Sequence, residues 1–361
     1  MTKAFHVVLL TPTAFPEVTG NAMTAERWRR ALSQEGVTVK VLATQHLDAE
    51  RLAALLESVR PDLVHAHHAT RAGLLMLDPR VAVKFSALPF VLSMAGTDMQ
   101  SFDAGKTERE RMKQVCHRAD CIVSHSREHV SILQGLLPDR AARIFRLPKA
   151  FLWQGNAYFD LRAVAGCRDH EILFFMPAGI RPVKGNLECL RALERAHALS
   201  PNFRVLFAGP SLDEDYASAF EKEIARLAVF ARRVPTIAPQ KMLSAYRGAD
   251  VVLNHSRSES LSNALLEAMA AGRPILASDI PGNRWLADDE GLLGPCACLF
   301  NPADPEDFVR RVLRLVHDEP LRASLAAGGL GRAKRWPNPS DEAAALLKIY
   351  EAAVGHTPGC P

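Results

Sequence analysis

The alternation of short apolar runs with longer amphipathic segments constrains the fold of this chain more than any other feature of its sequence. Such alternation is the pattern of βαβ units, in which helices cover the faces of a parallel sheet. In the first half, the apolar runs that predict strands are 6–11, 38–43, 63–66, 90–93, 121–124 and 144–147. The rhythm then starts again, with predicted strands at 172–177, 204–208, 251–254 and 274–278. The sequence therefore predicts an α/β protein with two Rossmann-like halves.

Helices are expected between these strands, and a break in the pattern separates two domains. The amphipathic segments predict helices at 24–35, 186–198, 213–228, 239–249, 263–271 and 339–354. Periodicity lapses between Pro148 and Asp169, which we interpret as an interdomain linker. The 361 residues exceed what one hydrophobic core usually holds. We therefore expect an N-terminal domain at 1–155 and a C-terminal domain at 170–338.

The composition is that of a globular protein that neither spans a membrane nor binds nucleic acid. The net charge of +4 arises from 44 basic and 40 acidic residues, and the arginine clusters lie in segments typical of solvated helix faces. No uncharged apolar run is long enough to span a bilayer, and the apolar start is too short for a secretion signal. These features predict a cytoplasmic protein, and they leave peripheral membrane contact open.

The cysteines and acidic runs predict no metal site. Seven cysteines at irregular spacing, with no secretion signal, favour reduced thiols. Cys296 and Cys298 have no matching pair of cysteines or histidines, so we expect buried thiols there. The run Asp213-Glu214-Asp215 is similar to a metal-binding triplet, but it begins a predicted helix, where acidic residues are common.

A loop with two cations follows the first strand of the second half. It runs from Gly179 to Gly185 and carries Arg181 and Lys184. A basic turn between a strand and a helix is the simplest explanation. The alternative is a diphosphate site, because a departing diphosphate needs its charge neutralised, and arginine and lysine can do so without metal.

Two glutamates, Glu259 and Glu267, flank the start of a predicted helix after the strand 251–254. The apolar residues of this helix recur at helical spacing and predict a buried stripe, from which Glu267 is offset toward solvent. A helix cap for Glu259 and a solvated face for Glu267 are the simplest explanations. The joint placement of both with the backbone N–H groups of 260–263 instead favours a site for an anionic ligand.

Both motifs follow strands at their carboxyl ends, where open α/β sheets bind ligands. A dinucleotide oxidoreductase is disfavoured because no Gly-x-Gly-x-x-Gly follows a strand. No Walker-type phosphate loop is present either. A nucleotide sugar carries both the diphosphate and the hydroxyl groups that cations and carboxylates bind.

Four motifs in combination resemble the retaining GT-B glycosyltransferases of family four, and the resemblance covers nearly the whole chain. These motifs are the Glu259–Glu267 spacing, the loop 179–185, Phe207-Ala208-Gly209-Pro210 and Asp62-Leu63-Val64-His65-Ala66-His67. The resemblance implies two Rossmann-like domains that face each other across a cleft. It also implies that Arg181 and Lys184 hold the donor diphosphate, that Glu267 binds the ribose and that Glu259 contacts the donor sugar. The final segment, 339–361, is expected to pack back on the N-terminal domain.

A narrower resemblance is to the glycosyltransferase-1-domain-containing proteins and the bacterial selenosugar synthases. It rests on the segments 19–27, Gly96-Thr97-Asp98 and Ile280-Pro281-Gly282-Asn283. These resemblances imply that Asp98 joins Glu259, Arg181 and Lys184 in the catalytic set. The further nucleotide-sugar contacts that they imply are Gly20, Asn21, Gly209, Ser260, Leu261, Ser262 and Asn263. The residues expected on the acceptor side are Thr24, Arg27, His67 and Arg71.

The predicted function is transfer of a sugar from a nucleoside diphosphate sugar, a UDP-sugar being favoured, with retention and without a metal or other cofactor. A small molecule or a glycan is the expected acceptor. Two departures from the family pattern lie near the donor sugar: Ala95 replaces a common histidine, and Ser260 replaces a common glycine. The alternatives are a selenosugar or thiosugar synthase and a non-catalytic nucleotide-sugar-binding protein. A phosphorylase is disfavoured because we find no sequence context for a pyridoxal-phosphate lysine.

Overall fold

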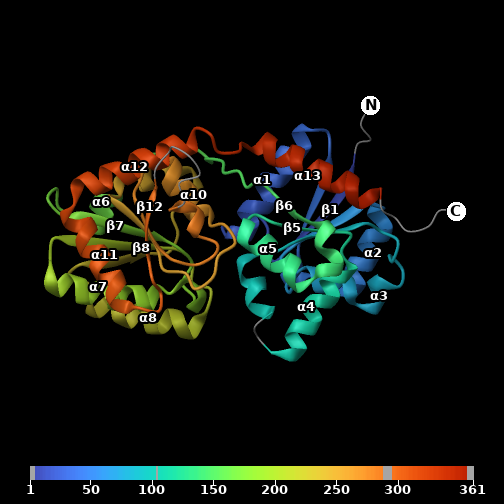
Figure 1. Ribbon diagram of the computed structural model, residues 1–361, viewed down its shortest axis with the longest axis horizontal. Helices are drawn as coiled ribbons and strands as arrows, with labels where there is room; N and C mark the ends of the chain where they lie inside the picture. Colours follow the sequence, from blue (N-terminus) through green and yellow to red (C-terminus); the bar gives the residue numbers. More distant parts are fainter. Residues whose placement is uncertain (1–4, 103–104, 288–294, 356–361) are drawn as a thin grey trace. The chain divides into compact units, whose positions relative to one another are not determined.

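The computed structural model describes residues 5–102, 105–287 and 295–355, and it divides the chain into two compact units. Unit 1 consists of Met1–Leu152 and Pro337–Pro361, and unit 2 of Trp153–Trp336. Each unit is a parallel sheet with helices on both faces, so the predicted α/β fold with two Rossmann-like halves is confirmed (Figure 1).

Unit 1 contains a parallel sheet whose strands run in the order β2-β1-β3-β4-β5-β6. The strands are β1 His6–Thr11, β2 Thr38–Ala43, β3 Leu63–His67, β4 Phe90–Ser93, β5 Cys121–Ser124 and β6 Ile144–Arg146. The helices are α1 Gly20–Gln34, α2 Ala49–Val59, α3 Pro79–Ala82, α4 Lys106–Arg118, α5 Arg127–Leu136 and α13 Pro339–Val354. The expected strands coincide with these to within one residue, because strands buried on both faces are nearly continuous apolar runs.

The two faces of this sheet bury separate sets of side chains. Val7 and Leu9 of β1 pack with Trp28 of α1 and Leu346 of α13 on one face. On the other face of the sheet, Val8 and Leu10 of β1 pack against α2, α4 and α5. The last helix of the chain therefore lies beside the first, α13 against α1 (Figure 1).

A buried carboxylate joins α13 to α1. Glu342 is only 1% exposed, and it accepts hydrogen bonds from Arg27 Nε at 2.6 Å, Arg27 Nη2 at 3.0 Å and Trp28 Nε1 at 2.8 Å. The backbone N–H of Ala150 donates to the same carboxylate at 3.2 Å. Arg27 is itself buried, so each charge compensates the other.

Unit 2 contains a second parallel sheet, with strand order β12-β11-β10-β7-β8-β9. Its strands are β7 Ile172–Pro177, β8 Phe203–Ala208, β9 Ala231–Val234, β10 Val251–Asn254, β11 Ile275–Ser278 and β12 Ala297–Phe300. Its helices are α6 Leu161–Ala165, α7 Asn186–Leu199, α8 Glu214–Arg226, α9 Met242–Gly248, α10 Asn263–Ala270, α11 Pro305–His317 and α12 Glu319–Ala333. The edge strands β9 and β12 are absent from the sequence-based prediction. Each has four residues and one neighbouring strand, and β9 contains two arginines.

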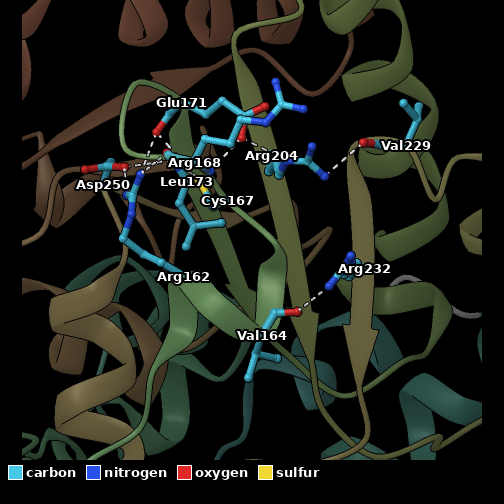
Figure 2. A network of polar contacts seen from close by, with 10 residues as sticks. All are labelled: Arg162, Val164, Cys167, Arg168, Glu171, Leu173, Arg204, Val229, Arg232 and Asp250. Carbon is cyan, nitrogen blue, oxygen red and sulfur yellow. Dashed lines mark hydrogen bonds and ion pairs between the residues drawn. The ribbon is translucent and has the colours of Figure 1, made fainter.

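Part of the segment interpreted as a linker belongs instead to the fold of unit 2. α6 lies within it, and a polar network fixes the turn that follows (Figure 2). Arg162 Nη1 donates to Asp250 Oδ2 at 2.8 Å, and its Nη2 donates to the carbonyls of Arg168 and Glu171 at 2.7 and 2.8 Å. Arg204 Nε donates to Glu171 Oε2 at 2.9 Å. The segment lacks periodicity because α6 has only five residues, and the ion pair of Arg162 with Asp250 joins it to the rest of unit 2.

The cysteines described by the structure are free thiols, and most are buried. Burial raises the pKa of Cys296 to about 11, and it also raises the pKa of Cys298. The buried-thiol prediction is thus confirmed for this pair, whereas Cys360 lies outside the described residues. Among the described helices, none combines the length and apolar character needed to cross a membrane.

The Glu342 contacts lead to a prediction about stability. Glu342→Ala should lower the free energy of unfolding by about 3–5 kcal/mol, because it leaves the buried Arg27 charge without a partner. Chemical denaturation followed by tryptophan fluorescence measures the change through Trp28. Glu351→Ala, an exposed site on the same helix, is the control and should change stability by less than about 0.5 kcal/mol. Equal effects of the two substitutions would contradict the role assigned to Glu342.

Candidate functional site

Two loops of unit 2 lie against each other because they follow the neighbouring parallel strands β7 and β10. The first loop is 178–185 and the second is 255–262. The backbone N–H of Arg257 donates to the carbonyl of Val183 at 2.9 Å. Gly185 has φ +63°, and a Cβ there would lie 2.5 Å from the carbonyl oxygen of His255. The close approach of the loops therefore requires glycine at this position.

Lys184 and Glu259 form an ion pair between these loops. Lys184 Nζ lies 2.5 Å from Glu259 Oε1, and the two side chains are 17% and 10% exposed. The same oxygen accepts hydrogen bonds from Ser256 Oγ at 2.7 Å and Asn254 Nδ2 at 3.1 Å. Three donors thus converge on Oε1, and none of the described residues donates a hydrogen bond to Oε2. This arrangement orients the carboxylate and leaves one oxygen available to a ligand.

The pKa of Glu259 reflects the same contacts. Burial alone raises the pKa of a carboxyl group, but the Lys184 charge and the hydrogen bonds from Lys184, Ser256 and Asn254 outweigh burial. The pKa of Glu259 therefore lies below its ordinary value, and the group is an anion at neutral pH. An anionic carboxylate can accept hydrogen bonds but has no proton to supply.

Asn283 holds the side chain of Asn254 in place. No role was predicted for Asn283 from the sequence. Asn283 is fully buried, and its Nδ2 donates to Asn254 Oδ1 at 3.2 Å and to the carbonyl of Ser278 at 3.1 Å. Because Asn254 Oδ1 also accepts the N–H of Ser256, the Asn254 amide must present its Nδ2 to Glu259. The motif Ile280-Pro281-Gly282-Asn283 was the available signal. A Cβ on Gly282 would lie 2.0 Å from the Glu259 carbonyl oxygen.

The amino terminus of α10 lies shortly after Glu259, at Asn263. Its N-cap residue, Ser262, makes no side-chain capping hydrogen bond. Ser260, Leu261 and Ser262 are buried, and Asn263 is half-buried. The predicted residues 260–263 thus connect Glu259, the partner of Lys184, to a helix end of the kind whose N–H groups and dipole attract anions.

Arg181 and Gly209 lie in the loops that follow the carboxyl ends of β7 and β8. Arg181 is half-buried in extended backbone, and its N–H donates to Asn186 Oδ1 at 3.3 Å. A Cβ on Gly209 would lie 2.2 Å from the carbonyl oxygen of Ala178. Packing between the two loops therefore requires this glycine.

Glu267 is not the solvated residue that its offset from the apolar stripe predicts. It is half-buried on α10, and its charge acts on Tyr246 of α9. Burial is the main cause that raises the pKa of Tyr246 well above its ordinary value, and Glu267 adds to it. The helical stripe itself is as predicted, because Leu265 and Met269 are buried. Glu267 is half-buried rather than solvated because α9 lies beside α10, and no local sequence pattern predicts that neighbour.

In unit 1, Asp98 connects the loops after β3 and β4. It is fully buried, and its Oδ2 accepts the N–H groups of Ala69 and Ala95, each at 2.8 Å. Its Oδ1 lies 2.8 Å from His68 Nδ1 and accepts the N–H of Thr70 at 3.2 Å. Burial raises the Asp98 pKa, but His68 and the backbone N–H groups outweigh it and lower the pKa. With both oxygens engaged, Asp98 holds these loops together, and its expected place in the catalytic set stays a prediction.

The other predicted residues of unit 1 are dispersed. Gly20 and Asn21 begin α1, Thr24 is buried one turn later and Arg71 is exposed. The guanidinium of Arg27 forms a buried pair with Glu342, and its expected acceptor-side role stays a prediction. His67 is buried at the end of β3.

No group of three or more potential metal ligands occurs among the described residues. Asp213 caps α8 and accepts the N–H of Tyr216 at 3.0 Å, while Glu214 and Asp215 lie in the first turn. The prediction that this acidic run begins a helix is confirmed.

Comparison with known proteins places both units in characterised families. Residues 5–126 match the family described as glycosyl transferase 4-like, and residues 170–318 match glycosyl transferases group 1. The chain is 26% identical over 333 residues to a glycosyltransferase 1 domain-containing protein 1 of Xenopus tropicalis, covering 89% of each protein. It is 29% identical over 199 residues to a D-inositol 3-phosphate glycosyltransferase of Streptosporangium roseum, which is 52% of this chain and 44% of that protein.

The fold also matches solved glycosyltransferase structures. The crystal structure of Anabaena HepE in complex with UDP and glucose has a TM-score of 0.74 at 16% identity, covering 96% of this chain and all of that one. The two parallel sheets with flanking helices are the GT-B architecture. The chain therefore consists of a glycosyl transferase 4-like region followed by a glycosyl transferases group 1 region, and it has the GT-B fold.

Proposed function

We propose that this protein transfers a sugar from a nucleoside diphosphate sugar, with a UDP-sugar as the favoured donor, to a hydroxyl-bearing small molecule or glycan. The proposal includes retention of configuration and independence from metal. The observation that carries it is the ion pair of half-buried Lys184 with buried Glu259, four residues before the start of α10, whose N-cap residue makes no side-chain capping hydrogen bond. A positive charge that can bind a diphosphate thus lies next to a carboxylate oxygen that can bind a sugar hydroxyl.

Each group of the site matches one part of such a donor. Lys184, Arg181 and the N–H groups at the start of α10 suit the diphosphate. Glu259 Oε2 suits a hydroxyl group of the sugar. Glu267, one helical turn or more further along α10, suits the ribose hydroxyls. The adjacent chemistry of cations and carboxylates favours this ligand class over a simple phosphate.

The reaction breaks the bond between the anomeric carbon and the diphosphate oxygen and forms a bond from the acceptor oxygen to that carbon. The acceptor's proton passes to the released diphosphate. Negative charge develops on the diphosphate as its bond breaks, and preorganised cations stabilise that charge. We propose no enzymic nucleophile.

The names of related proteins support this ligand class. The Streptosporangium relative is a glycosyltransferase, and the HepE crystal contains UDP and glucose. Both the family match of unit 2 and the site geometry concern the same residues, 179–267. We extend the nucleotide-sugar donor to this chain on those grounds.

The first test concerns Lys184. Lys184→Ala should lower turnover of the donor by roughly 10²–10³-fold, because it removes charge that stabilises the transition state. The measurement is steady-state release of UDP from a UDP-sugar, with kcat and KM determined separately. Arg257→Ala, which removes an exposed cation from the adjacent loop, is the matched control and should retain normal kinetics. Turnover of folded Lys184→Ala within a few-fold of the parent would refute the diphosphate site.

The second test concerns Glu267. Glu267→Ala should weaken nucleotide binding by roughly ten- to a hundredfold, because a charged hydrogen-bond acceptor is worth about 1.5–3 kcal/mol. Calorimetric titration with UDP, GDP and ADP measures the affinity and identifies the preferred base. Glu259→Ala is the comparison, because it should impair turnover more than nucleotide affinity. Unchanged affinity in Glu267→Ala would assign Glu267 a structural role beside Tyr246.

The third test concerns metal. Sugar transfer should persist fully in excess chelator, because protein cations and α10 supply the positive field. Activity is measured with the dialysed protein, with and without EDTA and then with added magnesium or manganese. Loss of activity that either ion restores would overturn the metal-independent part of the proposal.

A further inference from the structure

A third loop of unit 2, residues 279–283, lies directly against Glu259. It follows β11, the neighbour of β10 in the sheet, so it leaves the same edge as the loop of Glu259. A Cβ on Gly282 would lie 2.0 Å from the carbonyl oxygen of Glu259. The loop is a tight turn, in which the N–H of Asn283 donates to the carbonyl of Ile280 at 2.8 Å. Its side chains are therefore close enough to act on the Glu259 carboxylate.

Two buried amides connect this loop to that carboxylate. Asn283 Nδ2 lies 3.2 Å from Asn254 Oδ1, and Asn254 Nδ2 lies 3.1 Å from Glu259 Oε1. Asn283 is fully buried, while Asn254 and Glu259 are 7% and 9% exposed. Bulk water has little access to these groups, so an amide that loses its partner keeps an unpaired polar atom. We call this chain of hydrogen bonds the amide relay.

Backbone groups at both ends fix the direction of the amide relay. The carbonyl of Ser278 can only accept, and it lies 3.1 Å from Asn283 Nδ2, which must therefore be the donor. The N–H of Ser256 can only donate, and its acceptor is Asn254 Oδ1 at 3.2 Å. Asn254 consequently turns its NH₂ group to Glu259. The reversed Asn254 amide would place an oxygen against the carboxylate and an NH₂ group against two donors.

The end of β11 also supports Ser256, the second neutral donor to Glu259. Ser278, the last residue of β11, is fully buried. Its Oγ donates to the carbonyl of Ser256 at 2.6 Å, and Ser256 Oγ donates to Glu259 Oε1 at 2.7 Å. Both neutral donors thus depend on residues 278–283, whereas the charged donor, Lys184, comes from the loop after β7.

We infer that Asn283 is a positioning residue of the candidate site, which acts through Asn254 to hold Glu259 Oε1 and so keeps Oε2 open to a hydroxyl group of the donor sugar. The inference rests on the proposed function, because it concerns the carboxylate assigned to that sugar. Asn283 itself touches no reacting atom. Its loss should therefore lower turnover and leave nucleotide binding, which depends on other groups, unchanged.

A purely structural role for Asn283, as the last residue of the turn, makes a different prediction. Asn283→Leu keeps the side-chain volume nearly constant and removes both N–H donors. A structural role lowers the melting temperature alone, whereas a positioning role also lowers kcat. Glu171→Leu is the matched control for stability. Glu171 is buried and pairs with Arg204 directly before β7, at the opposite end of the sheet (Figure 2).

Steady-state release of UDP from a UDP-sugar measures kcat and KM, and calorimetric titration measures the affinity for UDP. Asn283→Leu should lower kcat by roughly tenfold, the loss expected when one orienting hydrogen bond is removed, with UDP affinity unchanged. Glu171→Leu should lower the melting temperature and keep the kcat of the parent. A parent-like kcat in Asn283→Leu overturns the inference, as does a loss of UDP affinity that matches the loss of kcat.

A double-mutant cycle tests whether Asn283 acts through Asn254. Asn254→Leu should lower kcat at least as much as Asn283→Leu, because it removes the donor to Glu259 itself. In the Asn254→Leu background, Asn283→Leu should have no further effect, since residues that act through one contact are not additive. Effects that multiply in the double variant would mean that Asn283 acts by another route, which also overturns the inference.

The carboxyl pKa of Glu259 tests the amide relay without catalysis. Burial raises this pKa, but the Lys184 charge and the hydrogen bonds from Lys184, Ser256 and Asn254 lower it below its ordinary value. Loss of a donor to the anion must raise it. Asn283→Leu should therefore move the titration of the ¹³C-labelled Glu259 carboxyl, assigned with Glu259→Gln, to higher pH.

The titration also separates this inference from the proposed function. The shift caused by Asn283→Leu should disappear in the Asn254→Leu background, and an unshifted titration in the single variant overturns the amide relay. Absence of donor cleavage in the parent would refute the proposed function alone, because the titration still reports on the relay.

Discussion

The buried charge of Glu342 is the constraint on which the rest of unit 1 depends. A carboxylate at 1% exposure is tolerable only with full compensation, and Arg27, Trp28 and the Ala150 N–H provide it. These contacts fix α13 beside α1 and hold the Trp28 indole in place. The rings of His65, His67 and His125 pack around that indole, so a residue near the end of the chain determines the surroundings of polar groups on β3 and β5.

Glu259 of unit 2 is also a buried carboxylate that needs hydrogen-bond donors, but its donors lie on one oxygen alone. Lys184, Ser256 and Asn254 all donate to one of its oxygens, and the other oxygen receives no donor from the described protein. Glu342, in contrast, has donors on both oxygens. A carboxylate with both oxygens engaged stabilises the fold, and one with an oxygen left open can bind a ligand. The low pKa of Glu259 follows from the donors already in place.

The sequence predicted those features that depend on local pattern. Buried parallel strands are apolar runs, so strands such as 6–11 and 251–254 were located to the residue. The edge strand β9 was missed because Arg232 and Arg233 interrupt its apolar character. The loops of Lys184 and Glu259 were recognised, but Asn283 was assigned no role. The pairing of Arg27 with Glu342 joins distant parts of the chain, and no local pattern could reveal it.

The two buried histidines of β3 differ in their hydrogen bonds far more than in their sequence positions. His65 and His67 belong to one motif and one face of β3, and burial lowers the pKa of each. Only His65 has partners for both nitrogens. A fold that satisfies one imidazole and leaves its neighbour open bears an energetic cost that packing alone does not explain.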